Sequence, residues 1–206
     1  WEDNGMIAAL SPWLEAGRAQ LICVDSIDGE SWYAAGRPPG ERAARHAAYD
    51  RYLEEEVLPL LWWLVPGATI GALGCSFGAY HAANFALRRP EAVPRAIALS
   101  GLYDIAHLGA VDEEPGWPPD GYTDENVAAH DPADYIANPG HEARVEAWRR
   151  MDLWLSSGCG DAGAADLRRF SEVLGRRDIP HSVTWVRGVA HDWPSWQELL
   201  VRRFAR

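Results

Sequence analysis

The pentapeptide Gly74-Cys75-Ser76-Phe77-Gly78 is the stretch that decides the fold. It follows an apolar run over 68–73 and leads into a helical pattern over 77–89, so a tight turn joins a strand to a helix. In a G-x-S-x-G pattern of this kind the turn strains the serine backbone, and the glycines leave room for the neighbouring chain. We therefore expect Ser76 to be an exposed nucleophile, with the backbone N–H of Phe77 as one oxyanion donor. The alternative, a glycine-rich turn that happens to contain a serine, does not account for the flanking strand and helix.

Strand and helix patterns alternate on both sides of this turn. Apolar runs predict strands over 20–25, 68–73, 95–100, 151–156 and 181–186. Periodic apolar positions predict helices over 6–15, 41–65, 77–89, 162–176 and 193–204, the second of them bent near Pro59. Shorter helices are expected over 124–130 and 141–149. This alternation predicts an α/β fold with a mostly parallel sheet flanked by helices, whose ligands bind at the carboxyl ends of the strands.

The composition indicates a single domain and argues against two classes of partner. The 206 residues, 48% of them hydrophobic, are enough for one sizeable core. A net charge of −11 argues against nucleic acid and anionic membranes, and no apolar stretch is long enough to span a bilayer. Cys23, Cys75 and Cys159 fit no zinc or redox spacing, so free thiols are expected. The oligomeric state stays open, a homo-oligomer included.

A nucleophilic serine needs a base to take its proton, and the base needs an acid to orient it. His191 is the best candidate base, because it lies in the loop between the last predicted strand and the last helix. Asp161 is the best candidate acid, because it follows strand 151–156 and therefore lies at the same edge of the sheet. A cap for the following helix is its alternative role, and the two roles are compatible. Asp104 is the second choice of acid, whereas Asp192 adjoins the base too closely to point at it.

Residues 101–150 interrupt the alternating pattern with prolines and acids, and we expect a lid-like insertion over the active face. Loop aromatics could line a substrate pocket there or could instead pack the loops down, and these are Trp32, Tyr33, Tyr103 and Trp117. The acids of 112–134 favour a solvated acidic surface over a calcium site. Neither a metal nor an organic cofactor is implied.

Four motifs in this order resemble the bacterial esterase family that includes esterase D, feruloyl esterases, enterochelin esterases and the mycolyltransferases. The motifs are Gly74–Tyr80, Ala98–Gly101, Gly158–Asp161 and His191–Trp196. The segment Asp25–Tyr33, which ends in Ser-Trp-Tyr, is similar to a loop of the mycolyltransferases. This resemblance implies an α/β-hydrolase fold and a catalytic triad of Ser76, Asp161 and His191, and it does not fix the acyl group.

The chain departs from this resemblance at its N-terminal end. Members of that family have about three further strands before the first helix, one of them central and followed by the oxyanion loop. Their absence would leave a gap between strand 20–25 and strand 68–73, although a sheet does not leave interior backbone groups unpaired. We therefore expect that an N-terminal segment of the natural protein is missing from this sequence or exists as a separate piece. The second oxyanion donor would be missing with it.

The expected function is that of a serine carboxylic-ester hydrolase, which cleaves a small-molecule ester through an acyl-enzyme intermediate. The same triad would serve an acyltransferase with an alcohol or sugar as acceptor, and the Ser31-Trp32-Tyr33 loop motivates this alternative. A non-catalytic binding protein on a hydrolase fold is the other alternative, since a fold does not fix function. No member of the triad is missing, which argues against it.

Overall fold

The computed structural model describes residues 1–107, 125–138, 144–188 and 191–205. Its centre is a four-stranded parallel sheet in the order β1-β2-β3-β4. The strands are β1 (Gly71–Cys75), β2 (Arg95–Leu99), β3 (Asp152–Gly158) and β4 (Ser182–Val186). Each lies within a few residues of its predicted range, so all four carboxyl ends meet at one edge of the sheet.

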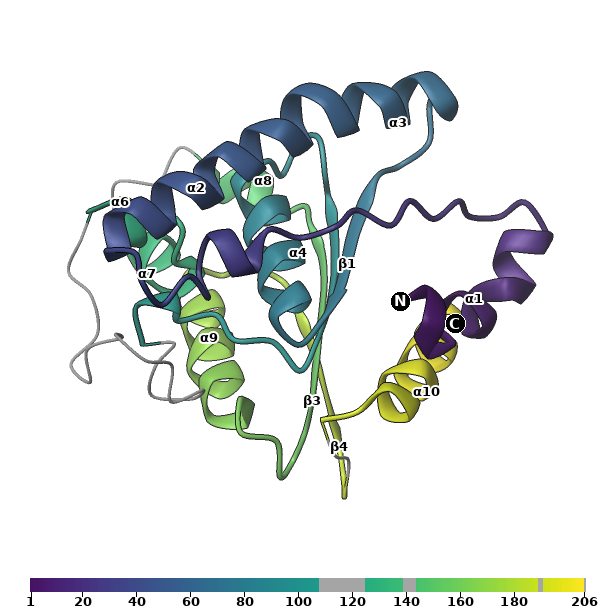
Figure 1. Ribbon diagram of the computed structural model, residues 1–206. Coiled ribbons are helices and arrows are strands. Elements are labelled where there is room, and N and C mark those ends of the chain that lie inside the picture. Colours follow the sequence, from purple (N-terminus) through teal and green to yellow (C-terminus); the bar gives the residue numbers. More distant parts are fainter. Residues whose placement is uncertain (108–124, 139–143, 189–190, 206) are drawn as a thin grey trace.

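Helices cover both faces of the sheet, because successive side chains of a strand point to opposite faces (Figure 1). Ala96 and Ala98 of β2 pack into a core shared with α4 (Phe77–Arg88) and α9 (Ala164–Arg176). Ile97 and Leu99 of the same strand pack on the other face. That face is covered by α1 (Met6–Glu15), which follows the short turn η1 (Glu2–Asn4), and by α10 (Trp193–Phe204). The two-layered core confirms the predicted α/β class.

The predicted helix 41–65 is continuous but changes its geometry in the middle. The chain runs through α2 (Pro39–Tyr52), the π-helical turn η3 (Leu53–Val57) and α3 (Leu58–Leu64). The π turn ends just before Pro59, where the proline lacks the N–H that a regular α-helix would use. Among the described residues, neither this helix nor any other is long and apolar enough to cross a membrane.

The predicted strand 20–25 is wrong. Residues 18–27 run without regular secondary structure from α1 to the short turn η2 (Asp28–Glu30), as Figure 1 shows. A strand needs a neighbouring ladder, and in the described sheet β1 has a partner only on its β2 side. A hollow of about 520 Å³ lies between this segment and the α2–α3 helix, and Ile22 is 43% exposed. An apolar run alone therefore did not make a strand here.

The described parts of 101–150 pack against the body of the protein. They contain η4 (Ile105–His107), α6 (Glu125–Ala128), α7 (Pro132–Ala137) and α8 (Val145–Trp148). Val127, Ile136 and Trp148 are buried, and α6 contacts α2 while α7 contacts α9 and α4. The lid-like role of the insertion stays a prediction, because 108–124 and 139–143 lie outside the described residues.

A buried polar cluster joins these helices to α2 and α4. His130, which follows α6, lies with its Nδ1 3.7 Å from Asp50 Oδ2. Arg88 Nε and Arg89 Nη1 lie 3.2 and 3.5 Å from the same oxygen. Burial, together with the two arginines, lowers the pKa of His130 to about 3.

We predict that His130 contributes to acid lability of the fold. Between pH 6.5 and about 3 the unfolded chain protonates this ring and the folded chain does not. The free energy of unfolding should therefore fall as the pH falls, with His130 adding a slope of up to about 1.4 kcal/mol per pH unit. His130→Gln should be less stable at neutral pH but should show a shallower loss of stability below pH 6.5 in urea unfolding. Parallel curves for the two proteins would contradict this assignment.

Candidate active site

Ser76 occupies a strained turn between β1 and α4. Its φ of 56° and ψ of −129° are rare for a residue with a side chain, and its N–H donates to Leu99 O at 2.8 Å. A Cβ on Gly74 would lie 1.9 Å from the carbonyl oxygen of Gly78, so only glycine fits there. A Cβ on Gly78 would meet no described atom within 4 Å. The first glycine of the motif is therefore required by packing, whereas the second is not.

His191 joins Ser76 to Asp161. Its Nε2 lies 2.7 Å from Ser76 Oγ, and its Nδ1 lies 3.0 Å from Asp161 Oδ2. Ser76 follows β1, Asp161 follows β3 and His191 follows β4, so the three groups come from the carboxyl ends of three parallel strands. The Asp161 side chain is 1% exposed and the His191 side chain 45% exposed. Distances and order fit a serine nucleophile, a base and an orienting acid.

Asp161 and Asp192, two of the candidate acids, have different hydrogen-bond partners. Asp161 makes contacts that suit both roles that the sequence allowed, because its Oδ2 lies 3.0 Å from His191 Nδ1 and its Oδ1 accepts from Gly163 N at 3.0 Å just before α9. Asp192 caps α10 by accepting from Ser195 N at 3.0 Å. His191 is hydrogen-bonded to Asp161, the first choice of acid.

Electrostatics keep the acid charged. Burial by itself raises the pKa of Asp161, but hydrogen bonds from His191, Gly163 and Ser100 outweigh it and lower the pKa below its usual value. Cys75, next to the serine, is the nearest thiol, and burial raises its pKa to about 12. A thiol attacks only as the thiolate, so Cys75 does not compete with Ser76 as nucleophile.

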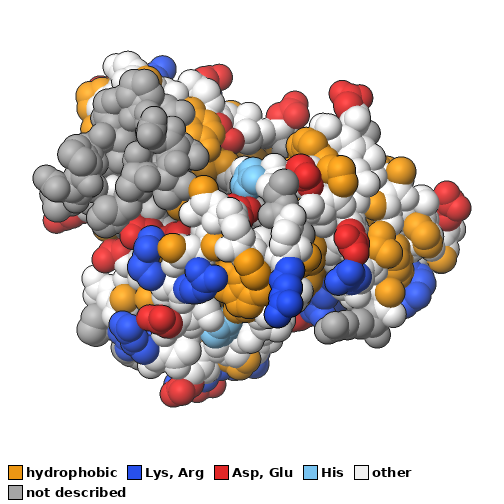
Figure 2. All heavy atoms as spheres, turned by 90° about the horizontal axis from the view of Figure 1, so that it is seen from below, with side chains coloured by type: hydrophobic (Ala, Val, Ile, Leu, Met, Phe, Trp, Pro, Cys, Tyr) orange, Lys and Arg blue, Asp and Glu red, His pale blue; other side chains and the backbone are white. Residues whose placement is uncertain are grey.

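A pocket of about 140 Å³ opens at this site, on the face that Figure 2 views from below. It is lined by Tyr33, Ser76, Phe77, Ser100, Gly101, Leu102, Asp161, Ala162, Gly163 and His191. Tyr33 packs on Phe77 with ring centroids 4.7 Å apart, which gives the pocket an aromatic wall. Acidic and arginine side chains are interspersed over the surrounding surface (Figure 2).

Of the four aromatic residues expected at the pocket, only Tyr33 lines it in the described structure. Trp32 is fully buried, with its ring 5.2 Å from that of His46. Tyr103 is also fully buried and stacks on Phe170 at 4.4 Å. Burial of a large aromatic ring contributes more to stability than partial exposure in a pocket wall. Trp32 and Tyr103 therefore pack their loops against the core and do not line the pocket. Trp117 lies outside the described residues.

The nucleophile strand lies at an edge of the described sheet. Phe77 is the first residue of α4 and directly follows Ser76, and its backbone N–H stays the predicted first oxyanion donor. A second oxyanion donor would come from a loop on the outer side of β1. No described strand lies on that side, so the second donor has no assigned residue.

One described cluster has the spacing of metal ligands. The ligand atoms of His46, Asp50 and His130 all lie within 4.8 Å of one another, and all three residues are buried. However, Arg88 and Arg89 lie within 3.5 Å of the carboxylate, and Asn84 Nδ2 already lies 3.2 Å from His46 Nε2. Two guanidinium groups oppose a cation there, so the cluster is poorly suited to a metal.

Residues 14–206 match the model of a protein family described as putative esterases. The chain belongs to this family. Its α/β-hydrolase fold recurs in a ferulic acid esterase, with a TM-score of 0.59 and 20% identity over 75% of this chain and 58% of that one. It also recurs in FphF, a fluorophosphonate-binding serine hydrolase of Staphylococcus aureus (TM-score 0.57, 22% identity, 76% of this chain and 62% of that one). An S-formylglutathione hydrolase of the same organism gives a TM-score of 0.55 and 22% identity over 81% and 62% of the two chains.

The chain of this esterase-family protein thus spans about three fifths of the length of these structures. No curated protein sequence matches it significantly.

We predict that Gly74→Ala destabilises the fold much more than Gly78→Ala. The added methyl at residue 74 would overlap the backbone of α4, and relief of that overlap should cost about 3 kcal/mol or more. The methyl at residue 78 enters open space in the first turn of a helix, where alanine is favoured. Urea unfolding of both variants measures the difference. Equal stabilities would contradict the close approach of β1 and α4.

Proposed function

We propose that the protein is a serine carboxylic-ester hydrolase in which Ser76, His191 and Asp161 form the catalytic triad. The observation that carries this proposal is the position of His191, which is within hydrogen-bond distance of both Ser76 and Asp161. Family membership and the serine-hydrolase name of a structural relative support it. The substrate class is a small-molecule ester.

The proposed reaction begins with proton transfer. The Ser76 hydroxyl gives its proton to His191 Nε2 while its oxygen attacks the ester carbon. Negative charge that develops on the carbonyl oxygen is stabilised by the Phe77 N–H. The ionised Asp161 accepts from His191 Nδ1 and stabilises the imidazolium that forms. The leaving alcohol then takes the proton from Nε2, which leaves Ser76 acylated.

The second half repeats these roles with water. His191 Nε2 takes a proton from water as the water oxygen attacks the acyl carbon, and the proton then returns to Ser76. An alcohol in place of water would give acyl transfer. The Ser31-Trp32-Tyr33 segment, whose tyrosine lines the pocket, keeps this alternative open. Product analysis with and without added alcohols separates the two reactions.

We predict that a fluorophosphonate probe labels Ser76. Such a probe reacts with an activated serine whatever the natural acyl group is. Ser76→Ala should abolish labelling, and His191→Ala should slow it strongly. Hydrolysis of a p-nitrophenyl ester should fall on the order of 10⁴-fold or more in either variant, because the two residues act as a unit. Peptide mapping identifies the labelled residue. A folded protein that is not labelled at Ser76 would argue for a binding protein instead.

We also predict that Tyr33 holds the substrate without taking part in the chemistry. Tyr33→Ala removes the wall that packs on Phe77, so KM should rise with kcat little changed. Tyr33→Phe keeps the ring and should behave like the wild type. The steady-state kinetics of the two variants with the same ester measure this. A drop in kcat alone would contradict a binding role.

A further inference from the structure

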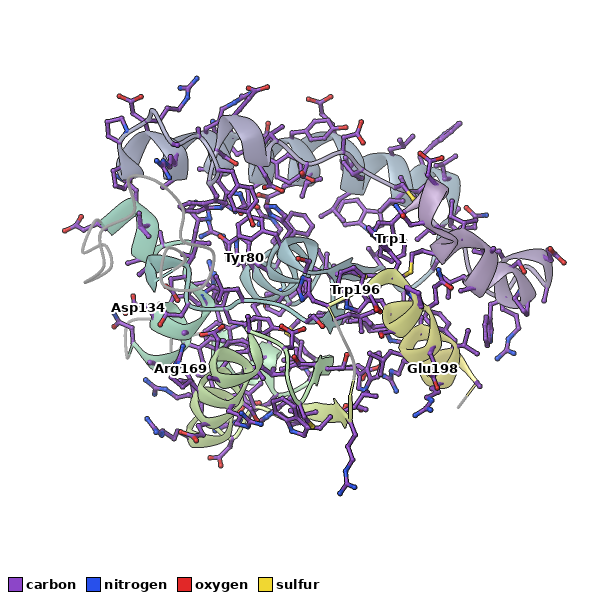
Figure 3. The ribbon with its side chains drawn as sticks, turned by 60° about the horizontal axis from the view of Figure 1, so that its bottom comes forward. Trp1, Tyr80, Asp134, Arg169, Trp196 and Glu198 are labelled. Carbon is purple, nitrogen blue, oxygen red and sulfur yellow. The ribbon has the colours of Figure 1, made fainter. Side chains whose placement is uncertain are left out.

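Two buried residues outside the proposed triad, Trp196 and Ser100, are linked by a hydrogen bond near Asp161. Trp196 is on α10 and Ser100 directly follows β2, and each is 4% exposed. The indole Nε1–H of Trp196 donates to Ser100 Oγ at 3.1 Å. Figure 3 shows Trp196 on the side of α10 that faces the sheet, whereas Glu198 lies on its outer side.

The tryptophan fixes the direction of the serine hydroxyl. A hydroxyl that accepts a hydrogen bond keeps its own proton to donate elsewhere. Ser100 and Asp161 line the same pocket, and the Ser100 side chain is among the groups that lower the pKa of the Asp161 carboxyl. The resulting chain of donors runs from Trp196 through Ser100 to the acid.

The backbone holds Ser100 in this place at a cost. Its φ of 55° is one of three positive values among the described residues other than glycine, and its N–H donates to Ser156 O at 2.7 Å. A strained conformation persists only where the surroundings impose it, and such positions cluster at functional sites.

The same tryptophan also contacts the base. The rings of Trp196 and His191 meet edge to face with centroids 5.0 Å apart. The capped first turn of α10, in which Asp192 accepts from Ser195 N, holds the tryptophan beside the histidine. Trp196 therefore contacts His191 directly and is linked to Asp161 through Ser100.

We propose that Ser100 and Trp196 are positioning residues for the acid of the triad, with the Trp196 N–H orienting the Ser100 hydroxyl so that it donates to Asp161. This inference rests on the proposed function. The Ser100 hydroxyl and His191 then both donate to the carboxylate, so each stabilises part of its negative charge. The hydroxyl also fixes the plane in which the carboxylate meets Nδ1 of His191.

The test compares Ser100→Ala with Ser156→Ala. Both remove a buried hydroxyl, one directly after β2 and one within the neighbouring β3, but the hydroxyl of Ser156 has no hydrogen-bond partner. In Ser100→Ala more of the carboxylate charge faces the imidazolium. The acid limb of the pH profile of kcat/KM should therefore move to higher pH. Because the carboxylate also loses its fixed orientation toward Nδ1, kcat should fall about tenfold with KM unchanged. Ser156→Ala should leave both unchanged.

A second pair tests the tryptophan. Trp196→Phe keeps a ring against His191 but removes the N–H, and it should shift the acid limb in the same direction as Ser100→Ala. Trp154→Phe is the matched control, because the N–H of that buried tryptophan donates to Thr184 at 3.0 Å instead. In the Ser100→Ala background, Trp196→Phe should have no further effect on the acid limb.

An NMR titration of the His191 ring measures the same effect without turnover. Its midpoint should move to higher pH in Ser100→Ala and stay in place in Ser156→Ala. If the wild type neither reacts with a fluorophosphonate nor hydrolyses esters, the proposed function fails. The titration still tests whether Trp196 and Ser100 act on Asp161. Identical titrations in Ser100→Ala and Ser156→Ala would overturn the inference.

Discussion

The close approach of β1 to the first turn of α4 is the constraint on which the site depends. Because Gly74 lies against the backbone of Gly78, the chain must reverse sharply, and Ser76 is forced to a positive φ at the end of the strand. The hydroxyl is thereby held clear of the sheet edge, within 2.7 Å of His191 Nε2. The strain is carried by a turn tied to β2 through Ser76 N and Leu99 O and packed from both faces of the sheet.

The parallel sheet brings the other residues of the site to Ser76. Residues far apart in sequence, Ser76, Asp161 and His191, meet because each follows a strand whose carboxyl end lies at the same edge. Geometry alone would leave a buried carboxylate with a high pKa. Hydrogen bonds to Asp161 outweigh the effect of burial, so the pKa of this carboxyl lies below its usual value. Burial and hydrogen bonding of Asp161 therefore have opposite effects on its pKa, and the site depends on both.

The features that the sequence could predict are those that depend on local sequence patterns. The strand–turn–helix context of Ser76 and the parallel α/β sheet follow from local patterns, and the proposed triad rests on the same patterns and on the topology that they imply. The strand 20–25 could not be decided locally, because a strand exists only when a neighbour pairs with it. Burial of Trp32 and Tyr103 depends on packing against distant elements. The contact of Ser100 with Trp196 joins residues 96 positions apart, and the only local signal was a serine at the carboxyl end of a strand.

The two parts of the proposed site, the base and acid and the oxyanion donors, are not equally complete in the described structure. The proposed acid and base, Asp161 and His191, follow β3 and β4 on the paired side of β1, and both hydrogen bonds of the proposed triad are present there. On the other side, Phe77 N–H is the one assigned donor, and a single oxyanion donor is worth about 10²–10³ in kcat. A serine with a full base and acid can therefore react rapidly with an electrophilic probe and still turn over an ester slowly.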